Sequence, residues 1–261
     1  MKIAIIGAGA MGGAIAEGIL KTDNFCASDL VVSDHHEQVL QHFAQKGAAT
    51  TPCNQKAAQA ADVVCIVVKP WHVEKTLKGI KDVMDYSRQT LLVVAAGVPS
   101  ANILQWMDKE GSVPPLFLVM PNIAIAYMAS ATYITPVGAT PEAVEAITGL
   151  FDKMGRTFLL EEDHYPAATA LSCSIAYAMR YARASMEAAV ELGFKAPQAK
   201  DIVLQTMQGA VSLLQATGEH PEAVIDKVTT PGGLTIRGLN EMEHAGFSSA
   251  VIRGVKKGLI K

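Results

Sequence analysis

The chain has 261 residues, of which 50% are hydrophobic and 18% are charged, and its formal net charge is −3. This length and apolar content suffice for one large or two ordinary domains with a substantial core. The weakly negative charge and the absence of a run of five or more basic residues disfavour proteins that bind nucleic acid or an anionic membrane.

The chain opens with a short apolar run that leads into a glycine-rich turn. Residues 3–6 predict a buried strand, and Gly7, Gly9 and Gly12 follow in the spacing GxGxxG, with a predicted helix at 11–20. In this context Gly7 permits a tight turn, Gly9 lets a pyrophosphate approach the backbone, and Gly12 lets the helix pack on the strand. The sequence therefore predicts a dinucleotide-binding loop. Its residues are Gly7, Ala8, Gly9, Ala10, Met11 and Gly12.

The residues after the second predicted strand, 30–33, bear on the choice of dinucleotide. An acidic residue here pairs with the ribose hydroxyls of NAD and repels the phosphate of NADP, so Asp34 favours NAD if it lies at the strand end. Ser33 with His35 or His36 is instead suited to hold the phosphate of NADP. Since Asp34 is equally typical of a plain turn, both cofactors stay open at this point.

Apolar runs alternate with helical patterns up to about residue 160, which is typical of a parallel, doubly wound sheet. Further strands are predicted at 30–33, near Ala49, and at 63–68, 91–95, 116–120, 131–135 and 157–160, with helices that include 38–45, 101–107 and 142–154. No residue between Glu110 and Glu142 carries a formal charge, but prolines divide this stretch into pieces too short to span a membrane. We therefore predict two buried strands there.

After Glu161 the strand patterns end. Residues 167–192 predict one long helix, and Pro197 and Pro221 are suited to the first turns of later helices. The predicted fold class is therefore α/β, with an N-terminal Rossmann-type doubly wound domain at 1–161 and an all-α domain at 162–261. The apolar helices of the second domain indicate burial against a second subunit, although packing within the chain is nearly as good an explanation.

The four cysteines, Cys26, Cys53, Cys65 and Cys173, are widely spaced and form neither a CxxC pair nor a cluster with histidine. This spacing disfavours a zinc site and a disulfide framework, so we expect no bound metal. It favours reduced thiols in a cytoplasmic protein.

Candidate site residues follow three of the predicted strands, at the edge where doubly wound sheets bind ligands. They are Lys69 and Pro70, Ala96 and Gly97, and Asn122. Gly97 lets the backbone lie against a nicotinamide and Asn122 offers both donor and acceptor groups, although ordinary turns use the same residues. In the helical region, Gly232 and Gly233 precede a predicted helix and expose backbone N–H groups suited to a carboxylate.

Six short segments follow one another in a distinctive order. They are Gly7-Ala8-Gly9-Ala10-Met11-Gly12, Val68-Lys69-Pro70, Ala95-Ala96-Gly97-Val98, Val119-Met120-Pro121-Asn122, Thr169-Ala170-Leu171-Ser172 and Pro231-Gly232-Gly233. In this order and spacing the chain resembles the pyrroline-5-carboxylate reductases along almost its whole length. The resemblance implies reduction of 1-pyrroline-5-carboxylate to L-proline, the last step of proline biosynthesis, by hydride transfer from NADPH or NADH. It also implies a homodimer or larger assembly that interleaves its C-terminal helices.

The resemblance further implies roles for individual residues. Besides the glycine loop, the implied cofactor-binding residues are Ser33, Asp34, Asn54, Val68, Lys69, Pro70, Ala96, Gly97 and Asn122. Gly232, Gly233 and Thr235 would hold the substrate carboxylate. Thr235 is also a candidate catalytic residue, together with Ser172 and Ser174.

The substrate half departs from the family's pattern. Leu118 stands where an arginine is usual, Pro166 where an aspartate is common, and Leu234 replaces the first of two threonines. A glycine-rich segment is reduced to Cys173-Ser174-Ile175-Ala176. These departures leave open a paralogous NAD(P)-dependent imine or hydroxy-acid oxidoreductase, or a non-catalytic dinucleotide sensor. A 3-hydroxyacid dehydrogenase would need a lysine on the helix at 167–192, which has none.

Overall fold

The computed structural model describes residues 1–259, which form two compact units, Met1–Ser172 and Cys173–Leu259. The contacts thus divide the chain after Ser172, whereas the boundary at 161 stays a prediction. Residues 260–261 of the predicted second domain lie outside the described residues.

Within the described chain, eight strands form one sheet in the order β3-β2-β1-β4-β5-β6-β7-β8. They are β1 (Ile3–Ile6), β2 (Leu30–Ser33), β3 (Ala49–Thr51), β4 (Val63–Ile66), β5 (Thr90–Val93), β6 (Leu116–Met120), β7 (Ser130–Val137) and β8 (Gly155–Leu159). The first six run parallel, in the strand order of the doubly wound dinucleotide-binding fold. The predicted fold class is confirmed.

The last two strands run in the opposite direction. β7 pairs antiparallel with β6, and β8 pairs parallel with β7. The sequence predicts a parallel sheet, which is wrong for these two strands. The connection at 121–129 holds only the 3₁₀ helix η3 (Ile123–Tyr127), whereas a parallel crossover needs about a dozen residues or more.

Helices cover both faces of the sheet. One core contains residues of α1 (Ala10–Leu20), α2 (Glu37–Gln45) and α6 (Pro141–Asp152), and the other contains residues of α3 (Asn54–Gln59), α4 (Pro70–Ile80) and α5 (Ser100–Met107). Ile3 and Ile5 belong to the first core, and Ala4 and Ile6 to the second, because side chains alternate along a strand. Burial on both faces explains why these strands are continuous apolar runs.

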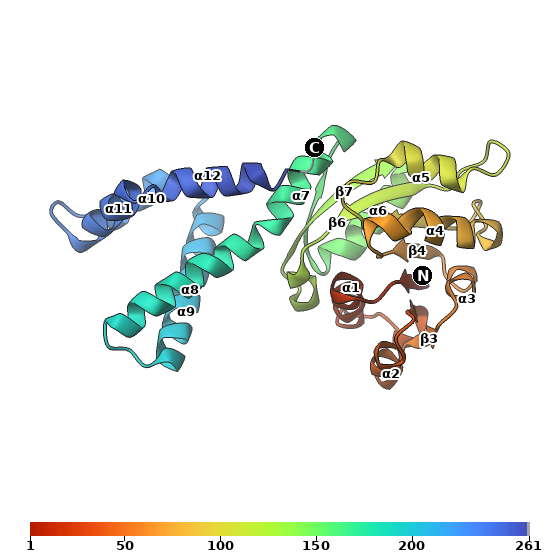
Figure 1. Cartoon of the computed structure of the whole chain (residues 1–261), viewed down its shortest axis with the longest axis horizontal. Helices are drawn as coiled ribbons and strands as arrows, with labels where there is room; N and C mark the ends of the chain where they lie inside the picture. Colours follow the sequence, from red (N-terminus) through yellow and green to blue (C-terminus); the bar gives the residue numbers. More distant parts are fainter. Residues whose placement is uncertain (260–261) are drawn as a thin grey trace. The chain divides into compact units, whose positions relative to one another are not determined.

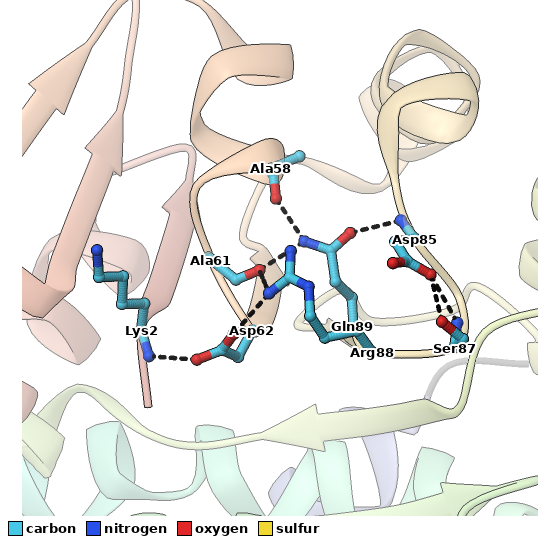
Figure 2. Close-up of polar contacts among 8 residues, drawn as sticks. All are labelled: Lys2, Ala58, Ala61, Asp62, Asp85, Ser87, Arg88 and Gln89. Carbon is cyan, nitrogen blue, oxygen red and sulfur yellow. Dashed lines mark hydrogen bonds and ion pairs between the residues drawn. The ribbon is translucent and has the colours of Figure 1, made fainter.

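Figure 2 shows a polar cluster at the edge of the sheet where β1, β4 and β5 begin. The backbone N–H of Lys2 donates to Asp62 at 2.9 Å, and the Arg88 guanidinium donates to the same carboxylate at 2.6 Å. Gln89 is 1% exposed, and its amide donates to the carbonyls of Ala58, in the last turn of α3, and Ala61, between α3 and β4. These bonds fix the starts of the three central strands, and therefore the positions of their carboxyl ends.

The C-terminal unit consists of helices (Figure 1). They are α8 (Ile175–Glu191), α9 (Ala196–Thr217), α10 (Pro221–Val228), α11 (Leu234–His244) and α12 (Phe247–Lys257). Pro197 and Pro221 lie in the first turns of α9 and α10, as predicted. The single helix predicted at 167–192 is wrong, because α7 (Tyr165–Cys173) ends one residue before Ser174. The Ser174 carbonyl accepts from the N–H of Tyr177 at 2.8 Å, a tight 3₁₀-type bond from which α8 begins.

Three short 3₁₀ helices complete the first unit, η1 (Ala27–Asp29), η2 (Lys81–Val83) and η4 (Glu162–His164). The four cysteines are all free. The uncharged stretch between Glu110 and Glu142 contains β6 and β7, which confirms the two predicted strands. From Met1 to Leu259, no helix combines the length and the apolar character needed to cross a membrane.

Candidate functional site

The turn between β1 and α1 requires glycine at two positions. Gly7 has a φ of +92°, and a Cβ there would lie 2.6 Å from the carbonyl oxygen of Val67. A Cβ on Gly12 would lie 1.9 Å from the carbonyl oxygen of Gly7. Any side chain at Gly12 would therefore push the helix away from the turn. The packing roles predicted for Gly7 and Gly12 are confirmed.

Gly9 occupies a different environment. Apart from Gly9 and its two chain neighbours, no described atom would lie within 4 Å of a Cβ on Gly9. Gly9 is the N-cap of α1 without a side-chain cap. The backbone N–H groups at the start of a helix lack partners within it and attract anions. The backbone beside Gly9 is therefore open, as a pyrophosphate at this turn would require. The binding roles of Ala8, Gly9, Ala10 and Met11 stay predictions.

A groove of about 520 Å³ adjoins this turn, and we call it the β2–α4 groove. Its lining residues are Ile6, Gly7, Ser33, Asp34, His35, Pro52, Cys53, Asn54, Gln55, Val68, His72, Lys75, Thr76 and Gly79. The strand order changes direction between β1 and β4, and doubly wound sheets bind ligands at this switch point. The groove thus brings together five predicted cofactor residues, which are Gly7, Ser33, Asp34, Asn54 and Val68.

Asp34 ties the glycine loop to the turn before α2. Its Oδ2 accepts from the Ala8 N–H at 2.8 Å, and its Oδ1 accepts from the His36 N–H at 2.9 Å. The Nδ1 of His36 lies 2.8 Å from the same Oδ1, and the Asp34 side chain is 10% exposed. Burial raises the pKa of Asp34, but the hydrogen bonds from His36 and Ala8 outweigh it and hold the pKa below its usual value. Both carboxylate oxygens are therefore engaged within the protein.

Ser33 and Asn54 are bonded to each other in the lining of the groove. The Ser33 hydroxyl, which is fully buried, donates to the side-chain carbonyl of Asn54 at 2.8 Å. Asn54 is the first residue of α3. Since its carbonyl already accepts this bond, its NH₂ group is the part that can donate to a ligand.

The predicted nicotinamide residues follow neighbouring strands. Val68 comes shortly after β4, and Lys69 and Pro70 form the N-cap and first residue of α4. Ala96 and Gly97 follow β5, and Gly97 has a φ of +73°. Because β4 and β5 are parallel neighbours, these residues lie at one edge of the sheet. Their contacts with a nicotinamide stay predictions.

Asn122 follows β6 at the same edge. Its Oδ1 accepts from the Ala124 N–H at 3.0 Å, and its own N–H donates to the Ser130 hydroxyl at 3.2 Å. The hydroxyl of Ser172, on α7, donates to the carbonyl of Pro121 at 2.9 Å and is buried. Ser172 therefore holds the segment beside Asn122, and its role toward a substrate stays a prediction.

A second cavity of about 280 Å³, the α7 cavity, includes Gly97 in its lining. The other lining residues are Val98, Pro99, Leu118, Glu162, Tyr165, Pro166 and Thr169. The Glu162 carboxylate accepts from the N–H of Ser100 at 2.8 Å and from its hydroxyl at 2.5 Å, at the start of α5. The Tyr165 hydroxyl is buried without a hydrogen-bond partner in the described chain, and burial raises its pKa. Leu118 and Pro166, which depart from the family's pattern, thus line one cavity.

The predicted carboxylate-binding residues belong to the C-terminal unit. Gly232 has a φ of +69°, and the N–H of Gly233 donates to the carbonyl of Thr230 at 2.8 Å. Gly233 is the N-cap of α11, whose first turn contains the exposed Thr235. Ser174 is the N-cap of α8. The roles of these residues toward a substrate stay predictions.

One face of α4 lines the β2–α4 groove without having been predicted from the sequence. His72, Lys75, Thr76 and Gly79 lie on it at helical spacing, while the opposite face is buried. The amphipathic pattern of α4 identifies its polar face as exposed. Nothing in that pattern distinguishes a face that meets a ligand from one that meets water.

Two family models match the chain. Residues 162–260 match the model described as pyrroline-5-carboxylate reductase dimerisation, and residues 2–97 match the model described as NADP oxidoreductase, coenzyme F420-dependent. Pyrroline-5-carboxylate reductase 1 of Dictyostelium discoideum is 34% identical over 97% of this chain, which spans about half (48%) of that protein. The pyrroline-5-carboxylate reductase of Methanosarcina acetivorans is 32% identical over 98% of this chain and 96% of that protein.

The fold also has solved counterparts. A pyrroline carboxylate reductase of Plasmodium falciparum, with NADP bound, superposes with a TM-score of 0.89 over 99% of this chain and 95% of that chain. The two sequences are 22% identical, so this likeness establishes a shared fold.

Proposed function

The chain belongs to the pyrroline-5-carboxylate reductase family, and from this relationship we propose that it reduces 1-pyrroline-5-carboxylate to L-proline with NADPH. The structural observation that carries the proposal is the open backbone at Gly9, next to the β2–α4 groove. A dinucleotide needs this room for its pyrophosphate at the helix start.

The cofactor supplies the hydride when it is bound in its reduced form. NADPH is favoured because residues 2–97 match a model of NADP oxidoreductases and because the Plasmodium protein binds NADP; NADH is the alternative. Gly7, Ala8, Gly9, Ala10, Met11 and Gly12 receive the pyrophosphate in this proposal. Ser33, Asp34 and Asn54 line the space for the adenosine ribose, where Asn54 supplies the donor and Asp34 holds the surrounding turn through Ala8 and His36.

The residues at the strand ends hold the nicotinamide in this proposal. They are Val68, Lys69, Pro70, Ala96, Gly97 and Asn122. Their contribution to the rate is to keep the nicotinamide and the imine ring in contact, since orientation alone lowers such barriers by several kcal/mol, roughly 7–11 in the best cases. Asn122 is suited to this task because hydrogen bonds from Ala124 and to Ser130 fix its position.

The start of α11 binds the substrate carboxylate in this proposal. The backbone N–H groups after Gly232 and Gly233 and the hydroxyl of Thr235 are the donors, and helix starts favour anions. Ser172 and Ser174 are the other candidate catalytic residues. A protonated imine is already a good electrophile, so the protein need not supply a strong acid.

We further infer a homodimer formed through the C-terminal helices. Support comes from the dimerisation model that matches residues 162–260 and from an apolar groove of about 780 Å³ in this unit. The groove is lined in part by Tyr177, Tyr181, Phe247 and Val251, which are exposed in the single chain. Exposed apolar patches of this kind mark interaction surfaces. The four free cysteines support a cytoplasmic location, where thiols stay reduced.

The decisive experiment measures oxidation of NADPH and NADH with 1-pyrroline-5-carboxylate, beside a panel of other cyclic imines and oxo acids. The proposal expects proline as product and the highest kcat/KM for 1-pyrroline-5-carboxylate. Faster turnover of another imine or oxo acid would identify a paralogue with a different substrate. Tight cofactor binding without turnover of any compound would identify a dinucleotide sensor.

A further inference from the structure

The two histidines that follow β2 have different environments. His36 holds its ring against Asp34, with Nδ1 2.8 Å from Oδ1, and does not line the β2–α4 groove. His35 lines the groove, is exposed, and has no hydrogen-bond or ion-pair partner among residues 1–259. From the sequence, either histidine is a candidate phosphate ligand. In the structure only His35 lines the groove, whereas His36 is held by Asp34.

Lysines on α4 differ in the same way. Lys78 forms an ion pair with Glu74 at 2.6 Å and lies outside the groove lining. Lys75 lines the groove and forms neither an ion pair nor a hydrogen bond within the described chain. It is therefore a cation whose charge no neighbouring carboxylate offsets through a direct contact.

In the described chain, one charged side chain of the groove is engaged by neighbouring residues and the other is not. The groove lining contains two side chains with a formal charge, Asp34 and Lys75. The Asp34 side chain is 10% exposed and both of its oxygens accept hydrogen bonds from Ala8 and His36, which leaves the carboxylate poorly placed to bind ribose hydroxyls. Lys75 and the ring of His35 are thus uncommitted groups able to meet a ligand's charge, and a third such group in the lining, the ring of His72, lies edge-on to Trp71.

We propose that Lys75 and His35 bind the 2′-phosphate of the cofactor and so make the chain prefer NADPH to NADH. This inference rests on the proposed function, because it assigns a subsite of the same cofactor. A phosphomonoester carries a charge of about −1.5 to −2 near pH 7. The ammonium of a lysine provides a compact charge with three donors, and the histidine ring provides an N–H donor. Ser33 is not a member of this subsite, because its hydroxyl is committed to Asn54.

The test compares two fragments of the cofactor, adenosine 2′,5′-bisphosphate and 5′-AMP, by titration calorimetry on the full chain. The variants are Lys75→Met and His35→Gln, and the matched control is Lys78→Met, three residues further along α4. We expect Lys75→Met to weaken binding of the bisphosphate about tenfold and His35→Gln to weaken it severalfold. Neither variant should change the affinity for 5′-AMP by more than about twofold, and Lys78→Met should change neither affinity.

Several outcomes would overturn the inference. Equal losses for both fragments would show that Lys75 acts on the adenosine or on the fold, and unchanged affinities would show that it does not reach the phosphate. Wild-type protein that reduces the substrate but binds both fragments equally would leave the proposed function intact and reject the subsite. Wild-type protein that binds neither fragment would reject the cofactor site as a whole.

Discussion

Ser33 is fully buried at the end of β2, yet it influences the β2–α4 groove through Asn54, whose side-chain carbonyl accepts a hydrogen bond from the Ser33 hydroxyl at 2.8 Å. This hydrogen bond occupies the side-chain oxygen of Asn54 and leaves its NH₂ group as the donor that Asn54 offers to the groove. A buried serine can therefore determine which hydrogen-bonding group the groove presents to a ribose.

Ser33→Ala should weaken cofactor binding without unfolding the protein. Loss of one hydrogen bond to Asn54 is worth about 1 kcal/mol, which corresponds to a roughly fivefold higher dissociation constant. Cofactor fluorescence titration measures the change, with the exposed Ser28→Ala as control. A dissociation constant that stays within twofold of wild type would show that the orientation of Asn54 does not matter for binding.

Gly9→Val should impair cofactor binding, whereas Gly12→Ala should impair the stability of the fold. The valine side chain at position 9 would enter open space, so Gly9→Val should keep the wild-type melting temperature. It should lose cofactor affinity at least about tenfold, because it fills the room for the pyrophosphate. A Cβ on Gly12 would collide with the Gly7 carbonyl, so this variant should lose about 3 kcal/mol of stability or more. Thermal unfolding and nucleotide titration of both variants separate the effects. An unchanged nucleotide affinity in Gly9→Val would contradict the dinucleotide loop.

Asp34→Asn should change how stability depends on pH. The pKa of Asp34 is lowered in the folded state, so the carboxylate stabilises the fold above its usual pKa of 3.8, and this contribution is lost as the pH falls through the lowered value. The difference in unfolding free energy between wild type and Asp34→Asn should therefore be greatest near neutral pH and shrink below pH about 4. Urea unfolding from pH 7 to pH 3 measures it, with the exposed Asp23→Asn as control. A difference that does not vary with pH would show that the carboxylate charge is not what His36 and Ala8 stabilise.

Tyr165→Phe should stabilise the protein. Among residues 1–259 the buried Tyr165 hydroxyl has no hydrogen-bond partner, and a buried hydroxyl left unpaired costs about 1–3 kcal/mol. Tyr86→Phe is the matched control, because the Tyr86 hydroxyl donates to the carbonyl of Met107 at 2.6 Å and its removal should cost about 1 kcal/mol. In urea unfolding, the free energy of unfolding should rise for Tyr165→Phe and fall for Tyr86→Phe. A lower free energy of unfolding for Tyr165→Phe would reveal a partner for this hydroxyl.

Thr235→Ala should raise the KM for 1-pyrroline-5-carboxylate and leave cofactor affinity unchanged. The reason is that the proposed carboxylate site at the start of α11 loses its hydroxyl donor, which is worth about 1.5–3 kcal/mol when it bonds a charged group. Steady-state kinetics with a separate cofactor titration measures both quantities. Thr206→Ala on the exposed surface of α9 serves as control. Kinetics identical to wild type would place the carboxylate site elsewhere.

The sequence was most informative where one residue pattern has one structural solution. Strands that are buried on both faces must be continuous apolar runs, and the limits predicted for β2 and β6 match the structure. The roles of Gly7 and Gly12 followed from sterics that act within a single turn. The composition of β7 does not indicate its direction. The connection at 121–129 does, because it is too short for a parallel crossover.

The candidate site was harder to predict because it depends on contacts between distant segments. Asp34, His35 and His36 are adjacent in the sequence, and only the fold reveals that Asp34 binds Ala8 and His36 while His35 lines the groove. Lys75 carried no signal, since a lysine on the polar face of an amphipathic helix is ordinary. In the sequence, Tyr165 likewise resembles any aromatic core residue, and only the fold shows that its hydroxyl has no partner in the described part of the chain.

The reversal at β7 bears on how the sheet assembles. Met120 pairs with Tyr133 across a short connection, whereas Ile3 pairs with Val63, far along the chain. Closing a short loop loses less chain entropy than closing a long one, so we expect the β6–β7 hairpin to form early and the β1–β4 pair to form late. The switch point that shapes the β2–α4 groove would then be among the last parts of the sheet to close, and the first to be lost when long-range pairing weakens.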